Sequence, residues 1–148
     1  TEDDTTGDVH DRLSLLGAGL MIKALADLEA GPVTLTPQAK EGVTAAAKVS
    51  PAEAGIDWSK SAAEVSAHIR GLSPNPGAWF EMDGQRIKVL HARTAAGSGS
   101  PGQVLDDNLL VACGDRAVRL TRLQRAGKGQ MTAEEFQRGA RIERGRRL

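Results

Sequence analysis

Apolar residues near the start of the chain recur at the spacing of a helix. Five leucines form this series: Leu13, Leu16, Leu20, Leu25 and Leu28. The period predicts a helix over residues 5–30, and the acidic residues near its start suit the positive end of a helix dipole. The segment LGAGL at 16–20 carries two glycines, each of which weakens a helix interior by about 1 kcal/mol. The pattern therefore allows a break into two helices at that point.

Three capping boxes, each a serine or threonine followed three residues later by glutamate, mark further helix starts. They are SPAE at 50–53, SAAE at 61–64 and TAEE at 132–135. The first predicts a short helical turn that Gly55 ends, and the second predicts a helix that stops at Gly71. The third predicts a C-terminal helix. Residues 32–48 have little periodicity and carry two prolines and a glycine, which predicts a linker.

Beyond Trp79 the apolar period changes to two, which is typical of half-buried strands. The alternation in QRIKVLHAR places two sets of residues on opposite faces: Ile87, Val89 and His91 on one, and Arg86, Lys88 and Leu90 on the other. GQVLDD, NLLVACGD and AVRLTRLQRAG are further short runs bounded by Gly, Asp or Asn, and DG at 83–84 and CGD at 113–115 indicate turns. Four or five such strands predict a small antiparallel barrel or sandwich.

The pattern as a whole predicts an α+β chain of N-terminal helices, a linker, a short helix, a small barrel and a last helix. The first helices have no sheet to pack on, so we expect that sheet to lie outside this chain. The first residue is Thr1 and no signal peptide precedes it, which favours a processed chain or a fragment. No apolar stretch approaches the roughly 18 residues needed to span a bilayer, so we expect no membrane partner.

Residues typical of catalysis do not gather in the sequence. His10, His68 and His91 lie far apart, and none has the spacing of a metal site such as HExxH. Cys113 lies in the apolar run LLVACGD, which predicts a small buried side chain. The acidic pairs at 3–4 and 106–107 suit a helix start and a turn. We therefore expect no catalytic residue and no metal site in this chain.

The formal net charge of zero hides a division between two parts of the chain. Residues 1–57 hold ten acidic and four basic residues, whereas residues 58–148 hold nine acidic and fifteen basic ones. In the second part, basic residues recur every three positions from Arg116 to Lys128. A basic barrel face binds a nucleic-acid backbone by releasing counterions, and the 3% aromatic content disfavours base stacking. A folded RNA recognised by shape therefore fits better, and a solvated surface with acidic partners is the alternative.

Three segments that occur in order are the most specific in the chain: IDWS, IRGLSPNPGAW and LQRAGKGQMTAEEF. With the sequence around them they closely resemble the C-terminal half of bacterial methionyl-tRNA formyltransferases, over nearly the whole chain. The resemblance implies transfer of a formyl group from 10-formyltetrahydrofolate to the amino group of initiator methionyl-tRNA. It also implies a monomer in the cytoplasm that uses no metal.

The resemblance implies three parts for the chain. Residues 1–33 correspond to the last helices of a Rossmann-like formyltransferase domain, 34–48 to a linker, and 49–148 to an OB-like tRNA-binding barrel with flanking helices. The family's catalytic Asn, His and Asp and its folate site lie upstream of the position that matches Thr1. His10 does not match the catalytic histidine, so no catalytic residue is assigned. Trp79 is expected to pack beneath the first strand.

The resemblance also implies a basic path for tRNA along the linker and the barrel. The residues that map onto this path are Lys48, Arg70, Arg86, Lys88, Arg119, Arg122, Arg125 and Lys128. Two alternatives remain open on the sequence. One is a formyltransferase that acts on another amine, such as a sugar nucleotide, and the other is a stand-alone RNA-binding module.

Overall fold

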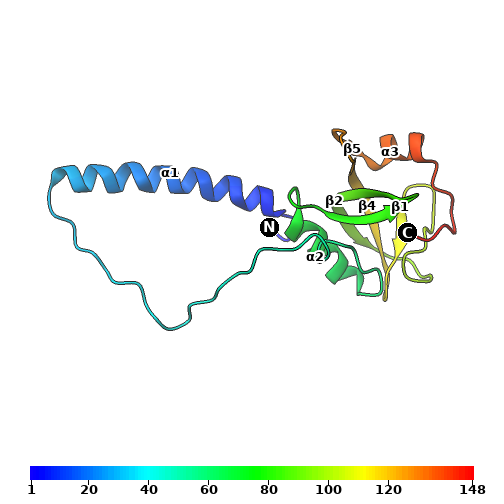
Figure 1. Ribbon diagram of the computed structural model, residues 1–148, viewed down its shortest axis with the longest axis horizontal. Helices are drawn as coiled ribbons and strands as arrows, with labels where there is room; N and C mark the ends of the chain where they lie inside the picture. The colour runs from blue at the N-terminus through cyan, green and yellow to red at the C-terminus, as the bar shows by residue number, and fades with distance from the viewer.

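The computed structural model describes residues 1–148 as a mixed chain of helix and sheet (Figure 1). The elements are α1 (Thr6–Ala30), α2 (Ala62–Leu72), β1 (Ala78–Met82), β2 (Gln85–Ala95), β3 (Leu110–Ala112), β4 (Ala117–Arg125), β5 (Gln130–Thr132) and α3 (Ala133–Ala140). Figure 1 shows the sheet as a compact body, from which α1 and the extended segment after it project to one side. The helix and strand types agree with the sequence pattern. The projecting helix α1 corresponds to the N-terminal helices for which the sequence offered no sheet to pack on.

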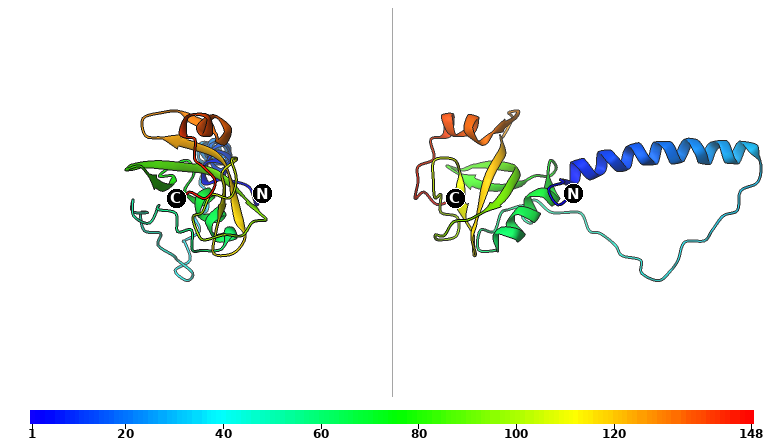
Figure 2. Two further views of the ribbon diagram at one scale, coloured as in Figure 1. Left: turned by 90° about the vertical axis from the view of Figure 1, so that its right-hand side faces the viewer. Right: turned by 180° about the vertical axis from the view of Figure 1, so that it is seen from behind.

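The five strands form one antiparallel sheet in the order β1-β2-β4-β3, with β5 beside β4. The two longest strands, β2 and β4, run through its centre, and the register between them shifts on both sides of His91. Such bulges increase the local bend and twist of a strand. The sheet curls, as the two views in Figure 2 show. The antiparallel pairing was predicted, and five strands lie within the predicted four or five, although GQVLDD is not one of them.

The core lies in the hollow of the curled sheet and is closed by α2 and α3. Ile69 of α2, Phe136 of α3 and Leu123 of β4 are each fully buried. Trp58 packs on Phe80 of β1, with the ring centroids 6.3 Å apart and the ring planes at 55°. Each of the three capping boxes forms both of its reciprocal hydrogen bonds, so each helical turn starts where the sequence predicted.

One correction concerns α1, which is a single helix of 25 residues without the predicted break. Gly17 and Gly19 keep their backbone N–H groups, so each costs helix stability without interrupting the hydrogen bonding. No residue of α1 is buried, and Leu15 is 76% exposed. The structure contains no helix that combines the length and the apolar character of a membrane span.

The first turn of α1 joins the helix to the sheet body. The Thr6 hydroxyl donates to the Gly71 carbonyl at 2.6 Å, and the Gly7 N–H donates to the Ser73 carbonyl at 3.0 Å. A Cβ placed on Gly7 would lie 2.8 Å from Cδ of Pro74, so this contact requires glycine. Residues 32–48 then return to the body without a helix or strand, as predicted for the linker.

Three further predictions about the strands are wrong. Leu90 is buried like Ile87 and Val89, and His91 is half-buried and paired with the exposed Arg122, because the bulge beside them shifts the alternation of β2. Trp79 lies within β1 and not beneath it, since its neighbours Ala78 and Phe80 take the inward positions. The GQVLDD run forms isolated bridges at Gln103 and Val104 instead of a strand.

Two local predictions are confirmed. Asp83 and Gly84 form the β1–β2 turn with φ values of 52° and 72°, the left-handed conformation that tight hairpins use. Cys113 is buried, as its apolar surroundings indicated.

Candidate nucleic-acid interface

The outer face of the sheet carries basic side chains because of the register of three strands. Trp79 of β1 pairs with Lys88 of β2, and Lys88 pairs in turn with Gln124 of β4. Residues that pair directly across antiparallel strands point to the same face. Since Ala78 and Ile87 are buried, Trp79, Lys88 and Gln124 lie on the opposite, outer face.

Trp79 fixes the end of the linker to this face. Its indole Nε1 donates to the Pro51 carbonyl at 2.9 Å. Its backbone N–H donates to Ala54 at 2.9 Å, and its carbonyl accepts from Ile56 at 2.8 Å. Residues 50–56 therefore pair with the free edge of β1. They lie close to the basic side chains of β2.

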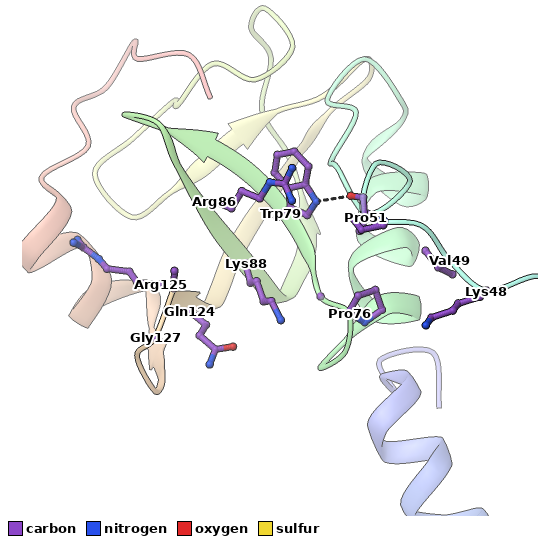
Figure 3. A pocket seen from close by; sticks show the side chains of 13 residues that line it. Lys48, Val49, Pro51, Pro76, Trp79, Arg86, Lys88, Gln124, Arg125 and Gly127 are labelled. Carbon is purple, nitrogen blue, oxygen red and sulfur yellow. Dashed lines mark hydrogen bonds between the residues drawn. The ribbon is translucent and has the colours of Figure 1, made fainter.

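These segments enclose a groove of about 510 Å³. We call it the basic groove and define it by eight of the residues that line it: Lys48, Val49, Pro51, Trp79, Arg86, Lys88, Gln124 and Arg125. Figure 3 shows Lys48 and Lys88 on opposite sides of it, with Pro76 between them. A Cβ on Gly77 would lie 2.8 Å from Cδ of Lys88, so glycine leaves room for the lysine stem.

The charge of the basic groove is not neutralised within the chain. No acidic side chain lines it, and Lys48, Arg86 and Lys88 take part in none of the ion pairs of the structure. The Arg86 guanidinium lies 4.2 Å from the centre of the Trp79 ring, so it covers the indole. The groove can therefore attract an anion, while its aromatic ring is already stacked on a cation.

Arg125 lines both the basic groove and a second hollow, and Lys128 lines the second hollow. The Arg125 guanidinium lies 4.9 Å from the centre of the Phe136 ring, and Figure 3 shows its side chain pointing away from Lys88 toward α3. Both basic residues line this second hollow together with Glu135 of α3. The predicted run of basic residues is thus divided at Arg125 between two hollows.

Arg119, which was also predicted to bind tRNA, makes an ion pair at a different place. Its guanidinium donates to both carboxylate oxygens of Asp106, at 2.6 and 2.8 Å, and to the Asn108 carbonyl at 2.9 Å. The hydrogen bonds that the Asp106 carboxylate accepts, first those of Arg119, lower its pKa. Arg119 therefore holds the turn before β3.

Arg70 of α2 and Arg122 of β4 lie near His91, which is at the bulge of β2. Arg122 is the register partner of His91 and is exposed, and Arg70 Nη1 donates to the Ser66 hydroxyl at 2.8 Å. Of the eight predicted residues, the structure therefore brings Lys48, Arg86, Lys88 and Arg125 to one groove. A role of any of the eight in tRNA binding stays a prediction.

Two groups of this face were missed by the sequence reasoning. One is Gln124, which the register places opposite Lys88 and which strand alternation could have found. The other is the Trp79–Pro51 hydrogen bond, which no sequence spacing indicates because the two residues meet only in the fold.

The histidines and Cys113, which were expected to have structural roles, do not come together in one site. His10 is exposed and 3.1 Å from Asp11, whereas Nδ1 of His91 lies 2.6 Å from the Thr121 hydroxyl. Burial raises the pKa of the Cys113 thiol to about 11. His10 and His91 thus each have a polar partner and Cys113 is buried, whereas Nε2 of His68 is buried without a hydrogen-bond partner.

Comparisons with known proteins cover the whole chain. Residues 48–141 match the family described as the formyl transferase C-terminal domain. The methionyl-tRNA formyltransferase of Sinorhizobium medicae (strain WSM419) is 58% identical over 93% of this chain and 46% of that protein. The enzyme of the same name from Bradyrhizobium sp. (strain ORS 278) is 54% identical over 100% of this chain and 49% of that protein. The chain thus spans about half the length of these relatives.

A similar fold occurs among solved structures. A variant of HypX from Aquifex aeolicus superposes with a TM-score of 0.72 at 19% identity, over 91% of this chain and 26% of that one. HypX in complex with tetrahydrofolic acid superposes with a TM-score of 0.64 at 22% identity, over 79% of this chain and 22% of that one. At these identities the similarity establishes the fold alone.

Proposed function

Since this chain belongs to the formyl transferase C-terminal domain family, we propose that it is the tRNA-binding part of a methionyl-tRNA formyltransferase. The whole enzyme would transfer the formyl group of 10-formyltetrahydrofolate to the amino group of initiator methionyl-tRNA, for translation initiation in the cytoplasm. This chain would hold the tRNA so that the methionyl amine reaches the catalytic part. Such positioning removes part of the entropic cost of bringing two reactants together.

The basic groove is the observation that carries this proposal. Lys48 comes from the linker and Arg86 and Lys88 from β2, and all three are free of ion pairs. Phosphate groups attract such cations, and their contacts release counterions from the RNA. A groove without a carboxylate avoids the repulsion that an acidic wall would impose on RNA.

The groove favours recognition of the RNA backbone and shape over stacking of bases. Trp79 is the aromatic residue that lines it, and Arg86 covers its ring at 4.2 Å. A base would have to displace this guanidinium before it could stack on the covered face. Contacts to phosphates need no such change, which fits a folded RNA recognised by shape.

The folate donor does not fit the residues of this chain. The groove is lined by cations and offers no enclosed apolar slot for a pteridine ring, and its indole is occupied by Arg86. We therefore assign donor binding and the chemical step to the part of the whole enzyme outside this chain. The Rossmann-like part is not in this chain.

We also propose the division of the chain that the resemblance implied. Residues 1–33 would complete the catalytic domain, 34–48 would link it, and 49–148 would form the OB-like tRNA-binding domain. The exposed leucines of α1 support the first part, because a helix with this much apolar surface is normally covered by another element. This exposure also argues against a stand-alone RNA-binding module.

The proposal is tested by measuring binding of initiator methionyl-tRNA to the 148-residue chain by fluorescence anisotropy at several salt concentrations. We expect affinity that falls steeply with salt, and a much weaker affinity for a variant with Lys48, Arg86 and Lys88 all changed to Gln. A variant with Lys60, Arg144 and Arg147 changed to Gln is the control with the same change in charge. Equal affinity of the two variants would contradict a specific role for the groove.

A second assay distinguishes the alternatives. The chain alone should form no formyl-methionyl-tRNA, whereas the enzyme completed with its catalytic part should do so. A completed enzyme that formylates a sugar nucleotide and ignores methionyl-tRNA would favour the alternative amine substrate.

A further inference from the structure

A second cavity that exposes arginines lies beyond the bulge of β2. Two arginines from different elements, Arg70 of α2 and Arg93 of β2, line one surface cavity together with the hydroxyl-bearing residues Ser66 and Thr94. The volume of this cavity is about 370 Å³. Arg70 Nη1 donates to Ser66, and neither arginine is in an ion pair. The remaining N–H groups of both guanidiniums are therefore available to an anion.

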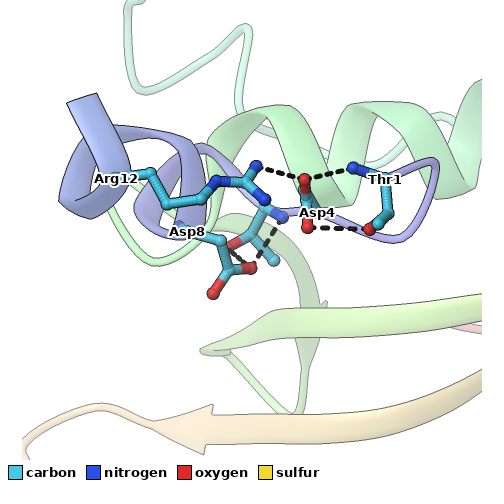
Figure 4. Close-up of polar contacts among 5 residues, drawn as sticks. Thr1, Asp4, Asp8 and Arg12 are labelled. Atoms are coloured by element: carbon cyan, nitrogen blue, oxygen red, sulfur yellow. Dashed lines mark hydrogen bonds and ion pairs between the residues drawn. The ribbon is translucent and has the colours of Figure 1, made fainter. Parts of the chain in front are cut away.

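The same cavity is lined by two acidic residues of the N-terminal segment, Glu2 and Asp3. The third acidic residue of this segment, Asp4, is used differently: Figure 4 shows it bound to Arg12 of α1. Asp4 thus fixes the segment, while Glu2 and Asp3 stay close to the arginines without forming an ion pair with them.

Charged residues of this cavity also affect the pKa of His91. Its pKa is lowered, first by burial and then by the charges of Arg93 and Arg122, although Asp3 acts in the opposite direction. Arg70 adds a smaller contribution of the same sign as the other two arginines. Asp3 therefore opposes the effect of the three arginines at His91.

We propose that Arg70 and Arg93 form a second phosphate-binding subsite, and that Glu2 and Asp3 weaken it by partial neutralisation. The proposal rests on the proposed function, because it takes the phosphate to be one of the RNA that binds the basic groove. Arg93 follows Lys88 by five residues on β2, or about 16 Å at the rise of a strand. One folded RNA can reach across this distance and contact both sites.

Glu2 and Asp3 are close enough to Arg70 and Arg93 for their charges to affect a phosphate bound there. They line the same cavity as the arginines, and charges at a protein surface interact over about 8 Å at physiological ionic strength. A phosphate entering the cavity would meet the attraction of Arg70 and Arg93 together with the repulsion of Glu2 and Asp3. The N-terminal segment would thus set the affinity of the subsite and make it sensitive to salt.

The test uses the 148-residue chain and initiator tRNA in three variants. Arg93→Gln should weaken binding about three- to tenfold and reduce the slope of log affinity against log salt by about one, as expected for one lost phosphate contact. Glu2→Gln combined with Asp3→Asn should strengthen binding about two- to fivefold at low salt, and the gain should vanish at high salt. The control Arg144→Gln removes an exposed arginine of the tail and should leave binding within about twofold.

The outcomes separate this inference from the proposed function. If the variant of Lys48, Arg86 and Lys88 loses affinity while Arg93→Gln binds like the control, the second subsite is refuted and the groove stands. If tRNA does not bind at all, the proposed function fails. Titration with inorganic phosphate, followed through the amide NMR signals of Ser66 and Thr94, then decides whether the cavity takes free phosphate. A shift that grows in the Glu2→Gln, Asp3→Asn variant supports an anion site, and unchanged signals overturn it.

Discussion

The Trp79 indole donates a hydrogen bond to the Pro51 carbonyl at 2.9 Å, and this bond connects the first strand of the sheet to the end of the linker. The same ring lies under the Arg86 guanidinium, 4.2 Å from its centre. One side chain thus joins the linker, β1 and β2 at the edge of the basic groove. Replacing it should loosen the linker without disturbing the core.

Trp79→Phe keeps an aromatic ring but removes the donor to Pro51. A hydrogen bond of this kind contributes about 1 kcal/mol, so local opening of residues 50–56 should become roughly fivefold more frequent. The Ile56 amide, which donates to the Trp79 carbonyl, should exchange with deuterium correspondingly faster. Exchange at the buried Leu123 should not change. Equal acceleration at both amides would mean that the variant destabilises the whole fold.

Asp106→Asn tests the ion pair with Arg119 and its dependence on pH. The folded pKa of Asp106 is lowered below its ordinary value of 3.8, so its stabilisation is present above that pH and is lost as the pH falls through the folded value. Both side chains are about one-third exposed, which limits the contribution to about 0.5–1 kcal/mol. Urea unfolding should show that difference between the two proteins at pH 7. Near pH 2 the difference should shrink, and a difference independent of pH would exclude the carboxylate charge as its source.

Two glycines of α1 should respond to alanine in opposite ways. A Cβ on Gly7 would lie 2.8 Å from Pro74, whereas nothing lies within 4 Å of Gly17. Gly17→Ala should stabilise the helix by about 1 kcal/mol, and Gly7→Ala should separate its first turn from residues 71–74. Far-ultraviolet circular dichroism during heating reports the first effect. Hydrogen exchange of the backbone amide at position 7, which bonds to the Ser73 carbonyl, reports the second when the variant is compared with the unchanged chain.

The Cys113 thiol should be unreactive in the folded chain. Burial raises its pKa to about 11, so the thiolate that reacts with disulfide reagents is scarce at pH 8. We expect modification to be slow in buffer and complete within minutes in guanidinium chloride. Fast modification of the native chain would show that β3 opens readily.

Structural features that are determined by residues close together in the sequence were predictable. The capping boxes at Ser61 and Thr132 start α2 and α3, and the Asp83–Gly84 pair forms the first hairpin turn, because each depends on residues within one turn. The bulge beside His91 was not predictable, since it results from the pairing of β2 with β4. For this reason the alternation misplaced Leu90.

The candidate site was predictable in its charge but not in its geometry. The resemblance identified Lys48 and Lys88, which lie 40 positions apart in the sequence and in the same groove of the structure. The sequence could not show that Arg119 is bound to Asp106 or that Arg125 lies on Phe136, since both contacts depend on tertiary packing. Spacing of every three residues therefore overestimated the number of basic residues on one face.

Both ends of the segment that projects from the sheet return to the same short stretch of chain. α1 begins on Gly71 and Ser73, and the linker ends on Trp79, so residues 8–49 behave as an excursion between two neighbouring anchor points. Closing a flexible loop costs only about 0.6 kcal/mol more for each doubling of its length. Insertions or deletions between residues 32 and 45 should therefore leave the sheet and the groove intact while changing how far the outer part of the chain can reach.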